Sequence, residues 1–527
     1  MKRLKRQACL LLAALLLFTI FTPDSSGVNL QGTAYADTVE NNRCWYEIFV
    51  YSFCDSDGDG IGDLQGVISK LNYLQELGVN GIWLMPIHPS PTYHKYDVTD
   101  YYSIDPQYGT MADFEELMEQ CRQRDIAVIL DLVLNHTSVE HPWFQAACDA
   151  LLAGEEDGSY VDYYQFSREQ KNMDYYPVEG TDWYYEGKFW SGMPDLNLEN
   201  EELRRQIRNI MAFWMEKGVC GFRLDAAKEY FSGQPSRNIQ VLNFLTQTAK
   251  SINPDAYLVA EVWEGFSTIA DYYKSGIPSL FNFAFADAGG KIVSVLRAVD
   301  NEKTVSSFAT AQEKADKAYR GINPDYIDAP FLSNHDTGRI AGFCSRDENK
   351  MKLAGAMNLL MSGNVFVYYG EELGMSGSGN DPSKRAPMLW NEAGDDGTTD
   401  PPPECQLPES YPLGSLEVQR QQENSIFRYY KSAIALRKAF PVISQGIPTA
   451  ETALNKDCVS ATRKSWNGES CIILMNISTG EKTVDLTGYE EFTLAGTLTV
   501  DENPVDHTEN QLRLPPYAVA VLYSEKE

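Results

Sequence analysis

Short apolar runs alternate with amphipathic stretches from Cys44 to about residue 435. The apolar runs have the length and residue content of buried strands, and the stretches between them have helical spacing. This alternation predicts an α/β fold with parallel strands joined by helices. Strands are predicted at 45–53, 80–86, 126–134, 218–225, 256–263, 279–285, 326–334 and 364–372, with helices such as 113–125 and 201–218 between them. Eight strand–helix repeats are the number that closes a (β/α)8 barrel.

Other segments depart from this alternation. Residues 138–199 form a long polar and aromatic insertion after the third strand, which predicts a lobe or functional loop. Residues 376–416, rich in Gly, Pro and Asp, predict a long loop after the eighth strand, and 427–440 predicts a closing helix. From about residue 441, short alternating runs separated by turns predict a separate antiparallel β-domain.

The N-terminus has the pattern of an export signal. Basic residues cluster at positions 2–6, an apolar run covers 8–21, and the small residues of 34–36 suit signal peptidase. We therefore expect a signal peptide at 1–36 and a mature, extracellular chain that begins near Asp37. An uncleaved membrane anchor is the alternative, although the apolar run is short for a span. No later segment is long and apolar enough to cross a bilayer.

The predicted domains are a signal peptide, a catalytic barrel in two parts, an inserted B domain and a C-terminal β-domain. Their predicted ranges are 1–36 for the signal, 37–137 and 200–440 for the barrel, 138–199 for the B domain and 441–527 for the C-terminal domain.

Charge and cysteine content narrow the classes of function. The formal net charge is −30, and removal of the signal segment, which carries +3, leaves −33. Such a surface repels nucleic acid and anionic membranes and is compatible with a neutral polysaccharide. Without Cys9 the chain keeps nine cysteines, so at least one is free or bonded to another molecule. Cys44 and Cys54 could pair, and the pairing stays open.

Chemically active side chains follow four of the predicted strands. His136 ends DLVLNH, Asp225 ends GFRLD, Glu261 ends LVAE and Asp336 ends FLSNHD. In a barrel these strand ends face one mouth, where active sites are built. Each residue alone is more often an ordinary loop residue or cap. Because each of the four follows a predicted strand, together they indicate an active site.

The residue types suggest glycosidic bond cleavage. That reaction needs one carboxylic acid to protonate the leaving oxygen and a second carboxylate to act at the anomeric carbon. Asp225 and Glu261 follow neighbouring predicted strands. Arg223 lies two residues before Asp225 and therefore on the same face of its strand, where its charge would keep Asp225 ionised. A purely structural Arg–Asp pair is the alternative.

At these residues the chain resembles the α-amylase family of glycoside hydrolases over nearly its whole mature length. Within that family it is most similar to secreted bacterial α-amylases of the oligo-1,6-glucosidase and neopullulanase-like group. The matching segments, in order, are DLVLNH (131–136), MPDLN (193–197), GFRLDAAK (221–228), EVW (261–263) and FLSNHD (331–336). The resemblance implies a (β/α)8 TIM barrel with an inserted B lobe after strand three and a C-terminal antiparallel β-sandwich domain. It also implies action on α-glucans, and we expect a monomer.

The resemblance further implies roles for single residues. Asp225 would be the nucleophile, Glu261 the general acid and then the general base, and Asp336 the carboxylate that binds sugar hydroxyls and stabilises the transition state. Three more residues match family residues that contact the reacting sugar, namely His136, Arg223 and His335. Tyr96 in YDVTDY matches the family's stacking tyrosine. For either histidine the alternative is a buried structural role.

A calcium site is predicted in the segment DSDGDGIGD, residues 55–63. Alternating aspartates with a glycine at the sharp turn supply hard oxygen ligands that suit Ca2+. The predicted ligands are Asp55, Asp57, Asp59, Asp63 and the carbonyl of Ile61. A solvated acidic turn is the alternative, and the segment is not a full EF-hand. Family members carry a similar loop after the first strand. A second family calcium site, near Asn135, stays open because Glu229 replaces a common His and Asp195 alone does not decide it.

The same resemblance favours internal cleavage of α-1,4 links. Exo-acting relatives close the site with a carboxylate just before the stacking tyrosine, paired to an arginine after strand eight. Arg385 is present here, but Tyr93 and His94 stand where that carboxylate would be. The small Ala226 leaves room for an α-1,4-linked acceptor sugar, to which Lys228 could hydrogen-bond. The alternative is that loop 376–416 closes the cleft.

Three hypotheses therefore stand. The first is a secreted, retaining, endo-acting α-amylase. The second is a relative on the same fold that is neopullulanase-like or cyclomaltodextrinase-like, exo-glucosidic, or a 4-α-glucanotransferase. The third is a non-catalytic sugar-binding protein, against which the intact trio of Asp225, Glu261 and Asp336 argues.

Overall fold

The computed structural model describes residues 43–156, 158, 160–508 and 510–525. The predicted signal segment, 1–36, lies outside the described residues. Within the described part, no helix combines the length and apolarity needed to cross a membrane. All nine cysteines in that part are free, so Cys44 and Cys54 do not pair.

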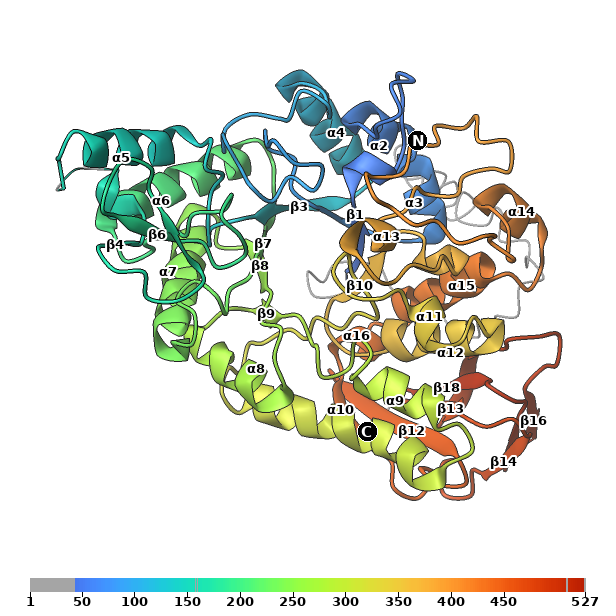
Figure 1. Cartoon of the computed structure of the whole chain (residues 1–527). Helices are drawn as coiled ribbons and strands as arrows, with labels where there is room; N and C mark the ends of the chain where they lie inside the picture. The colour runs from blue at the N-terminus through green and yellow to red at the C-terminus, as the bar shows by residue number, and fades with distance from the viewer. Residues whose placement is uncertain (1–42, 157, 159, 509, 526–527) are drawn as a thin grey trace, which may run out of the picture.

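A curled parallel sheet forms the centre of the molecule (Figure 1). Its strands lie in the order β10-β1-β2-β3-β7-β8-β9, the order expected for consecutive strand–helix repeats. Their bounds are β1 Cys44–Ile48, β2 Gly81–Leu84, β3 Ala127–Leu132, β7 Gly221–Leu224, β8 Tyr257–Ala260, β9 Ser279–Leu280 and β10 Val365–Tyr368. Seven of the eight predicted strands are therefore present, each shorter than its apolar run.

The predicted strand at 326–334 is wrong as a regular strand. Its one ladder contact is a single parallel bridge between Phe281 and Ala329. Pro330 has no backbone N–H to donate, and the amide of Ala329 donates instead to Asp328 Oδ1, 3.0 Å away. The residues that would extend the ladder therefore lack free donors.

The same segment nevertheless closes the barrel. The amide of Ile327 donates to the carbonyl of Pro278, 2.8 Å away, beside β9. On its other side the amide of Asn364, just before β10, donates to the carbonyl of Asp328 at 2.8 Å. The segment thus occupies the seventh barrel position, and the fold is the expected TIM barrel.

Helices surround the sheet (Figure 1). The predicted helices 113–125 and 201–218 correspond to α4 Met111–Gln123 and α6 Glu201–Glu216. A capping box between Thr110 and Asp113 begins α4. The other helices around the barrel with six or more residues are α2 Leu64–Ser69, α3 Leu71–Leu77, α7 Pro235–Ile252, α8 Phe266–Tyr272, α9 Lys291–Arg297, α10 Glu302–Arg320, α12 Glu348–Leu359, α14 Leu416–Gln421 and α15 Ile426–Ala439. Helices of three or four residues are η1 Val50–Ser52, η3 Tyr273–Ser275, α11 Ile340–Phe343, η4 Glu371–Leu373, α13 Asp381–Lys384 and α16 Val442–Gln445.

The insertion after β3 forms a small lobe at one end of the molecule. It contains α5 Pro142–Leu152, η2 Val161–Tyr163, and the antiparallel strands β4 Phe166–Ser167, β5 Tyr175–Pro177 and β6 Tyr184–Glu186. An isolated bridge between His136 and Asp195 ties the end of the lobe to the barrel. The lobe thereby lies beside the predicted active-site mouth.

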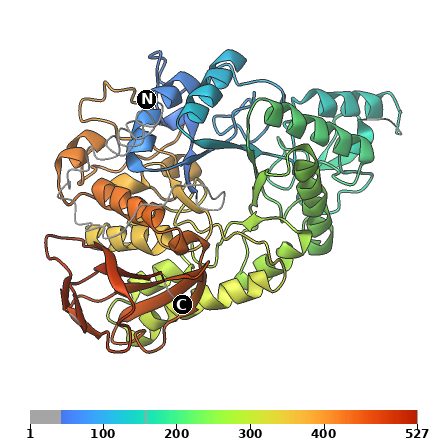
Figure 2. The ribbon, with the colours of Figure 1, turned by 180° about the vertical axis from the view of Figure 1, so that it is seen from behind.

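The C-terminal domain lies at the opposite end in both views (Figures 1 and 2). Its five-stranded sheet has the order β11-β12-β13-β18-β15, and its three-stranded sheet the order β14-β17-β16. Their bounds are β11 Ile447–Ala450, β12 Val459–Trp466, β13 Glu469–Asn476, β14 Lys482–Asp485, β15 Thr493–Leu498, β16 Asp506–Thr508, β17 Gln511–Leu514 and β18 Val519–Ser524. Ile472 and Leu474 belong to the core within the domain, together with Leu512 of β17, whereas Ile473 belongs to the barrel core. Alternate side chains of one strand thus serve two cores. The exact domain boundaries stay predictions.

Inward-facing side chains form two layers inside the barrel. One layer is aromatic and consists of Trp45, Trp83, Phe281 and Phe366. Two residues further along β1, the inward position is Glu47, and Asp131 pairs in register with Arg223 on the neighbouring strand. The interior therefore changes from apolar to charged toward the carboxyl ends of the strands.

Candidate active site

A cavity of about 310 Å³ opens at the carboxyl ends of the barrel strands. Its lining residues come from strand ends, from the inserted lobe and from the loop after β10: His94, Tyr96, His136, Phe189, Trp190, Met193, Asp225, Ala226, Lys228, Glu229, Glu261, Trp263, Asp336, Asp381 and Arg385. All three predicted catalytic carboxylates line this one cavity. Arg223 and His335 do not line it, because both side chains are fully buried behind the carboxylates.

One guanidinium organises the predicted reacting pair. Arg223 Nη1 lies 2.5 Å from Asp225 Oδ1 and 2.8 Å from Asp131 Oδ1, and Arg223 Nη2 bonds Glu261 Oε2. The prediction that Arg223 shares a face with Asp225 is confirmed, and the guanidinium also reaches the next strand end. A buried arginine with its donors fixed in a planar fork holds these carboxylates in set positions.

The backbone after β7 turns sharply at Ala226. This residue has a positive φ of 43°, a conformation that residues other than Gly, Asn and Asp seldom adopt. The turn aims the amide of Ala226 at Glu261 Oε2, 3.3 Å away. Asp225 is thus presented at the cavity while its neighbour contacts the second carboxylate.

Glu261 has the electrostatics of a proton donor. Burial raises its pKa to about 7, with Arg223 opposing the shift and the charges of Asp225 and Asp336 adding to it. A large protonated fraction is therefore present at neutral pH. A carboxylic acid with a raised pKa beside a second carboxylate is the combination that glycoside hydrolysis requires.

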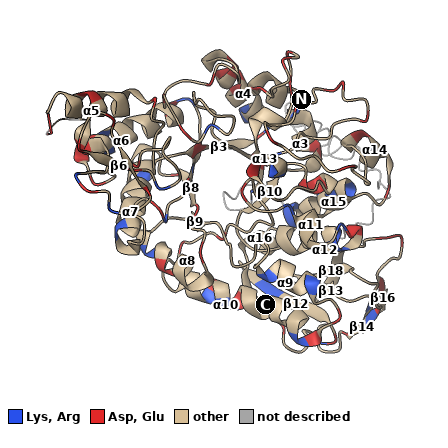
Figure 3. Ribbon diagram, viewed as in Figure 1, with Lys and Arg blue, Asp and Glu red and all other residues tan. Residues whose placement is uncertain are grey.

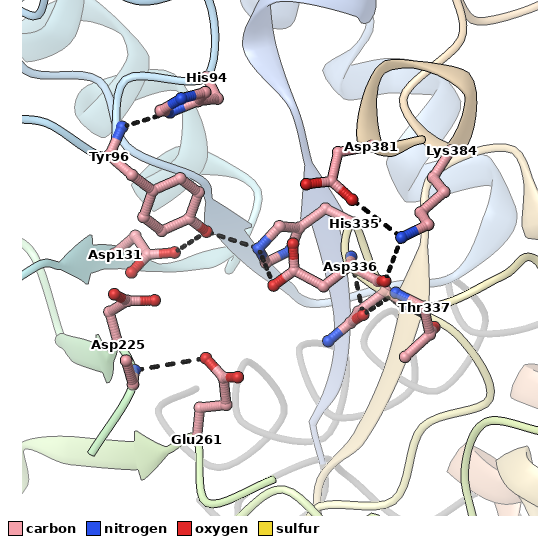
Figure 4. Close-up of polar contacts among 12 residues, drawn as sticks. His94, Tyr96, Asp131, Asp225, Glu261, His335, Asp336, Thr337, Asp381 and Lys384 are labelled. Atoms are coloured by element: carbon pink, nitrogen blue, oxygen red, sulfur yellow. Dashed lines mark hydrogen bonds and ion pairs between the residues drawn. The ribbon is translucent and has the colours of Figure 1, made fainter. Parts of the chain in front are cut away.

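Asp336 is held as an anion on the facing side of the site (Figure 4). Burial opposes its charge, but His335 and then Arg385 outweigh burial and hold its pKa below the usual range. Arg385 Nη2 lies 2.9 Å from Asp336 Oδ1, and His335 Nε2 lies 3.1 Å from Asp336 Oδ2. Lys384 Nζ fixes the backbone by donating to the Asp336 carbonyl at 2.7 Å.

Tyr96 forms one wall of the cavity. Its hydroxyl donates to Asp131 Oδ2 at 2.9 Å and lies 2.7 Å from His335 Nε2. The ring stacks on His335 with centroids 5.4 Å apart. These contacts immobilise the ring, which is the condition for a stacking platform under a sugar.

The two predicted sugar-contacting histidines have opposite electrostatics. Burial lowers the pKa of His136 to about 4, so its ring is neutral, and its Nε2 lies 3.2 Å from the carbonyl of Tyr96. Burial also opposes the charge on His335, but Asp336 and Glu47 outweigh it and raise that pKa to about 9. The ring of His335 is therefore charged at neutral pH.

Lys228 lies at the cavity edge with its ammonium already engaged. Its Nζ donates to the carbonyl of Trp263 at 3.0 Å and lies 3.1 Å from Glu264 Oε1. The predicted hydrogen bond from Lys228 to an acceptor sugar stays a prediction.

Sequence reasoning missed three exposed aromatic residues that line the cavity. Phe189 and Trp190 come from the inserted lobe, and Trp263 follows β8; their exposed fractions are 50%, 47% and 39%. Trp263 stacks on Phe283 with centroids 5.3 Å apart. The sequence did offer a signal for each: Phe189 and Trp190 stand just before the motif MPDLN, and Trp263 ends the motif EVW. Exposed aromatic faces beside buried carboxylates suit stacking on sugar rings.

The predicted calcium loop brings three carboxylates together. One oxygen of each of Asp55, Asp57 and Asp63 lies within 4.8 Å of the others, and Asp59 falls outside this cluster. Asp63 also caps α2 through Gly66 N at 2.7 Å. The cluster supplies the hard oxygen ligands that calcium prefers, so these residues fit the ion. Ile61 donates its amide to Asp59 Oδ1 at 2.7 Å.

At the second family calcium position protein donors reach Asp195, whereas Asn135 Oδ1 is buried with no hydrogen-bond partner in the described part of the chain. Asn135 Nδ2 donates to Asp195 Oδ1 at 3.0 Å, and the amide of Lys188 donates to Asp195 Oδ2 at 3.1 Å. Each oxygen of the Asp195 carboxylate thus has a protein donor. Burial raises the pKa of Asp195 well above its ordinary value.

Comparison with known sequences decides the family. The profile described as the catalytic domain of alpha amylase matches residues 47–446.

The chain belongs to the α-amylase family.

Similar proteins within the family carry several names. Alpha-amylase 3 of Dictyoglomus thermophilum is 39% identical to this chain over 455 residues, which cover 85% of this chain and 87% of the relative. The oligo-1,6-glucosidase of Parageobacillus thermoglucosidasius is 30% identical, covering 83% and 90%. The solved structure of Eubacterium rectale Amy13B is 43% identical, covers 93% of this chain and 97% of its own, and has a TM-score of 0.90. The protein is therefore a glycoside hydrolase of the α-amylase family.

Proposed function

We propose that the protein is a secreted, retaining, endo-acting α-amylase that hydrolyses internal α-1,4-glucosidic bonds of starch and maltooligosaccharides. The observation that carries the proposal is the pair formed by Glu261, with a pKa of about 7, and Asp225, both held by Arg223. The family membership supplies glucan hydrolysis, and this pair supplies the two groups of a double displacement.

In the first step Glu261 donates its proton to the glycosidic oxygen while Asp225 Oδ attacks the anomeric carbon. The bond to the leaving chain breaks, and a β-glycosyl ester on Asp225 forms. In the second step the Glu261 carboxylate takes a proton from water, whose oxygen attacks the anomeric carbon and releases Asp225. Two inversions return the product with the α configuration.

The remaining site residues bind and orient the sugar in this proposal. Asp336, kept anionic by His335 and Arg385, accepts hydrogen bonds from sugar hydroxyls and stabilises the positive charge of the transition state. Tyr96 stacks against the sugar, and His136, neutral at the cavity wall, contacts it.

The position of Arg385 supports endo-action. Its guanidinium bonds Asp336 Oδ1 at 2.9 Å and the Tyr93 hydroxyl at 3.2 Å, and no carboxylate between residues 43 and 96 is paired with it. The exposed aromatic faces of Trp190 and Trp263 at the cavity favour a chain that continues beyond the reacting sugar.

Exo-action is the second candidate because of Asp381. This residue of the loop 376–416 lines the cavity, and its Oδ2 lies 3.9 Å from Arg385 Nη2. A maltoheptaose blocked at its non-reducing end separates the two. Endo-action predicts cleavage of the blocked sugar at a rate close to that of the free sugar. No cleavage of the blocked sugar, with fast cleavage of the free one, would establish exo-action.

Transfer and branch-point specificity need a separate experiment. Products from starch, pullulan and cyclodextrin are resolved by chromatography. A hydrolase predicts reducing-sugar release with short products from starch. Products longer than the substrate would indicate a 4-α-glucanotransferase, and preferred attack on pullulan or cyclodextrin a neopullulanase-like or cyclomaltodextrinase-like enzyme.

Calcium, export and assembly complete the proposal. A Ca2+ ion bound by Asp55, Asp57 and Asp63 would stabilise the loop after β1 and take no part in the chemistry. The N-terminal signal sends the enzyme outside the cell, where its polymeric substrate lies. The enzyme acts as a monomer on a neutral glucan, and its acidic charge, with Asp and Glu on many surrounding helices (Figure 3), excludes nucleic acid as a partner.

A further inference from the structure

Glu47 is a buried carboxylate that touches the active site from behind. It lies on β1, faces the barrel interior and is 1% exposed. Its Oε1 lies 2.6 Å from His335 Nδ1 and 3.4 Å from the backbone N–H of His335. Glu47 is not among the residues that line the cavity, so any effect on the reaction passes through His335.

The other ring nitrogen of His335 faces two oxygens. Nε2 lies 2.7 Å from the Tyr96 hydroxyl and 3.1 Å from Asp336 Oδ2. The Tyr96 hydroxyl donates its only proton to Asp131 Oδ2, 2.9 Å away, so it can only accept from His335. A carboxylate can also only accept. Nε2 must therefore carry a proton, and Glu47 requires another on Nδ1.

We propose that Glu47 is a positioning residue that keeps both ring nitrogens of His335 protonated, so that the imidazolium holds Asp336 in place for the sugar. The role of Asp336 in sugar binding rests on the proposed function. The protonation of the His335 ring rests only on the contacts of its two nitrogens.

Charges act on His335 from several elements. The carboxylates are Glu47 on β1, Asp131 on β3, Glu261 just after β8 and the adjacent Asp336. Two arginines oppose them: Arg223 of β7, which bonds Asp131, and Arg385, whose Nε donates to the His335 carbonyl at 3.2 Å. Tyr96 stacks on one face, and Trp83 of β2 contacts an edge. Among the described residues, only Glu47 and Asp336 touch the ring nitrogens with a charge. Loss of Glu47 therefore removes one of two charged partners, and the ring with both has a pKa of about 9.

The direct test is the titration of His335 in the full-length protein. Imidazole nitrogens are observed by NMR after selective 15N-histidine labelling, and the His335 signal is assigned by its loss in His335→Asn. We expect Glu47→Gln, which keeps the shape and removes the charge, to lower the pKa of His335 by about one to three pH units. Glu47→Asp keeps the charge and should recover at least part of the shift.

A matched control is Glu372→Gln. Glu372 is also fully buried beside β1, where its Oε1 accepts from Tyr46 at 2.8 Å, but it does not contact His335. The His335 titration should be unchanged in this variant. An unchanged titration in Glu47→Gln, or an equal shift in Glu372→Gln, would overturn the proposal.

A second readout links the ring to sugar binding. The Glu261→Gln background blocks the reaction and removes the titration of Glu261, so maltoheptaose affinity can be measured against pH. With Glu47 present, affinity should hold up to about pH 9; in Glu47→Gln/Glu261→Gln it should begin to fall about one to three pH units lower. Coincident profiles would overturn the link to Asp336. Failure of Glu261→Gln to bind maltoheptaose at any pH would instead contradict the proposed function, and the NMR titration would still decide the role of Glu47.

Discussion

At the scale of single residues, Arg223 has more partners than its sequence position suggests. The period of a strand places it on the face of Asp225, but its contacts with Asp131 and Glu261 come from neighbouring strands. Periodicity could therefore predict one of these contacts and not the others, which depend on the curvature of the closed barrel. The same holds for Glu47, whose partner His335 lies 288 residues away.

Replacement of the nucleophile should abolish turnover and spare binding. Asp225→Asn keeps the size of the side chain but cannot form the glycosyl ester, so kcat on starch should fall by several orders of magnitude. Affinity for maltoheptaose, measured by calorimetry, should change little. Substantial starch hydrolysis by this variant would contradict the assignment of Asp225.

The pH profile should report Glu261. The acid must be protonated to donate, and burial places its pKa near 7, so kcat/KM should be lost as pH rises through about 7. Above that value the decrease should approach tenfold per pH unit. Glu261→Gln should lower kcat by about 10²- to 10⁴-fold and lose this alkaline limb. A wild-type limb that persists in Glu261→Gln would assign it to another group.

At the scale of elements, the sequence predicted seven of the eight barrel strands correctly. It did not predict that the segment in the seventh position is irregular. The apolar run 326–334 resembles a strand, yet Pro330 and the hydrogen bond between Ala329 N–H and Asp328 limit its ladder to a single bridge. Run length was also a poor guide to strand bounds, since the runs 218–225 and 256–263 continue past β7 and β8 into the loops that carry Asp225 and Glu261. The aromatic residues of the inserted lobe gave no periodic signal.

The loop after β1 should depend on calcium. Three carboxylates within 4.8 Å repel one another without a cation, so chelation should lower the melting temperature. Free calcium at 100 times its Kd would contribute about 2.7 kcal/mol to the free energy of unfolding.

Calorimetric melting of two variants identifies the ligands. Asp57→Asn should remove most of the difference between calcium and chelator, whereas Asp59→Asn, outside the cluster, should preserve it. An identical midpoint for the wild type after verified metal removal would rule out a stabilising ion in this loop.

At the scale of the whole molecule, the barrel and the C-terminal domain share a core through one sheet. Ile473 of β13 is 2% exposed within the core that the sheet shares with the barrel. Ile473→Ala should lower the free energy of unfolding by about 2–5 kcal/mol, because it leaves a cavity between the two bodies. Ile447→Ala, at a position 46% exposed, is the matched control and should change stability by less than about 0.5 kcal/mol. Equal effects in denaturant titrations would contradict a shared core.

The central claim is a double displacement through Asp225, and the anomeric form of the first product tests it most directly. Proton NMR, recorded within the first minutes of maltoheptaose hydrolysis and before mutarotation, distinguishes the α from the β anomer at the new reducing end. The arrangement of Asp225 and Glu261 around Arg223 predicts the α anomer. Initial release of the β anomer would show a single displacement by water and would contradict the mechanism.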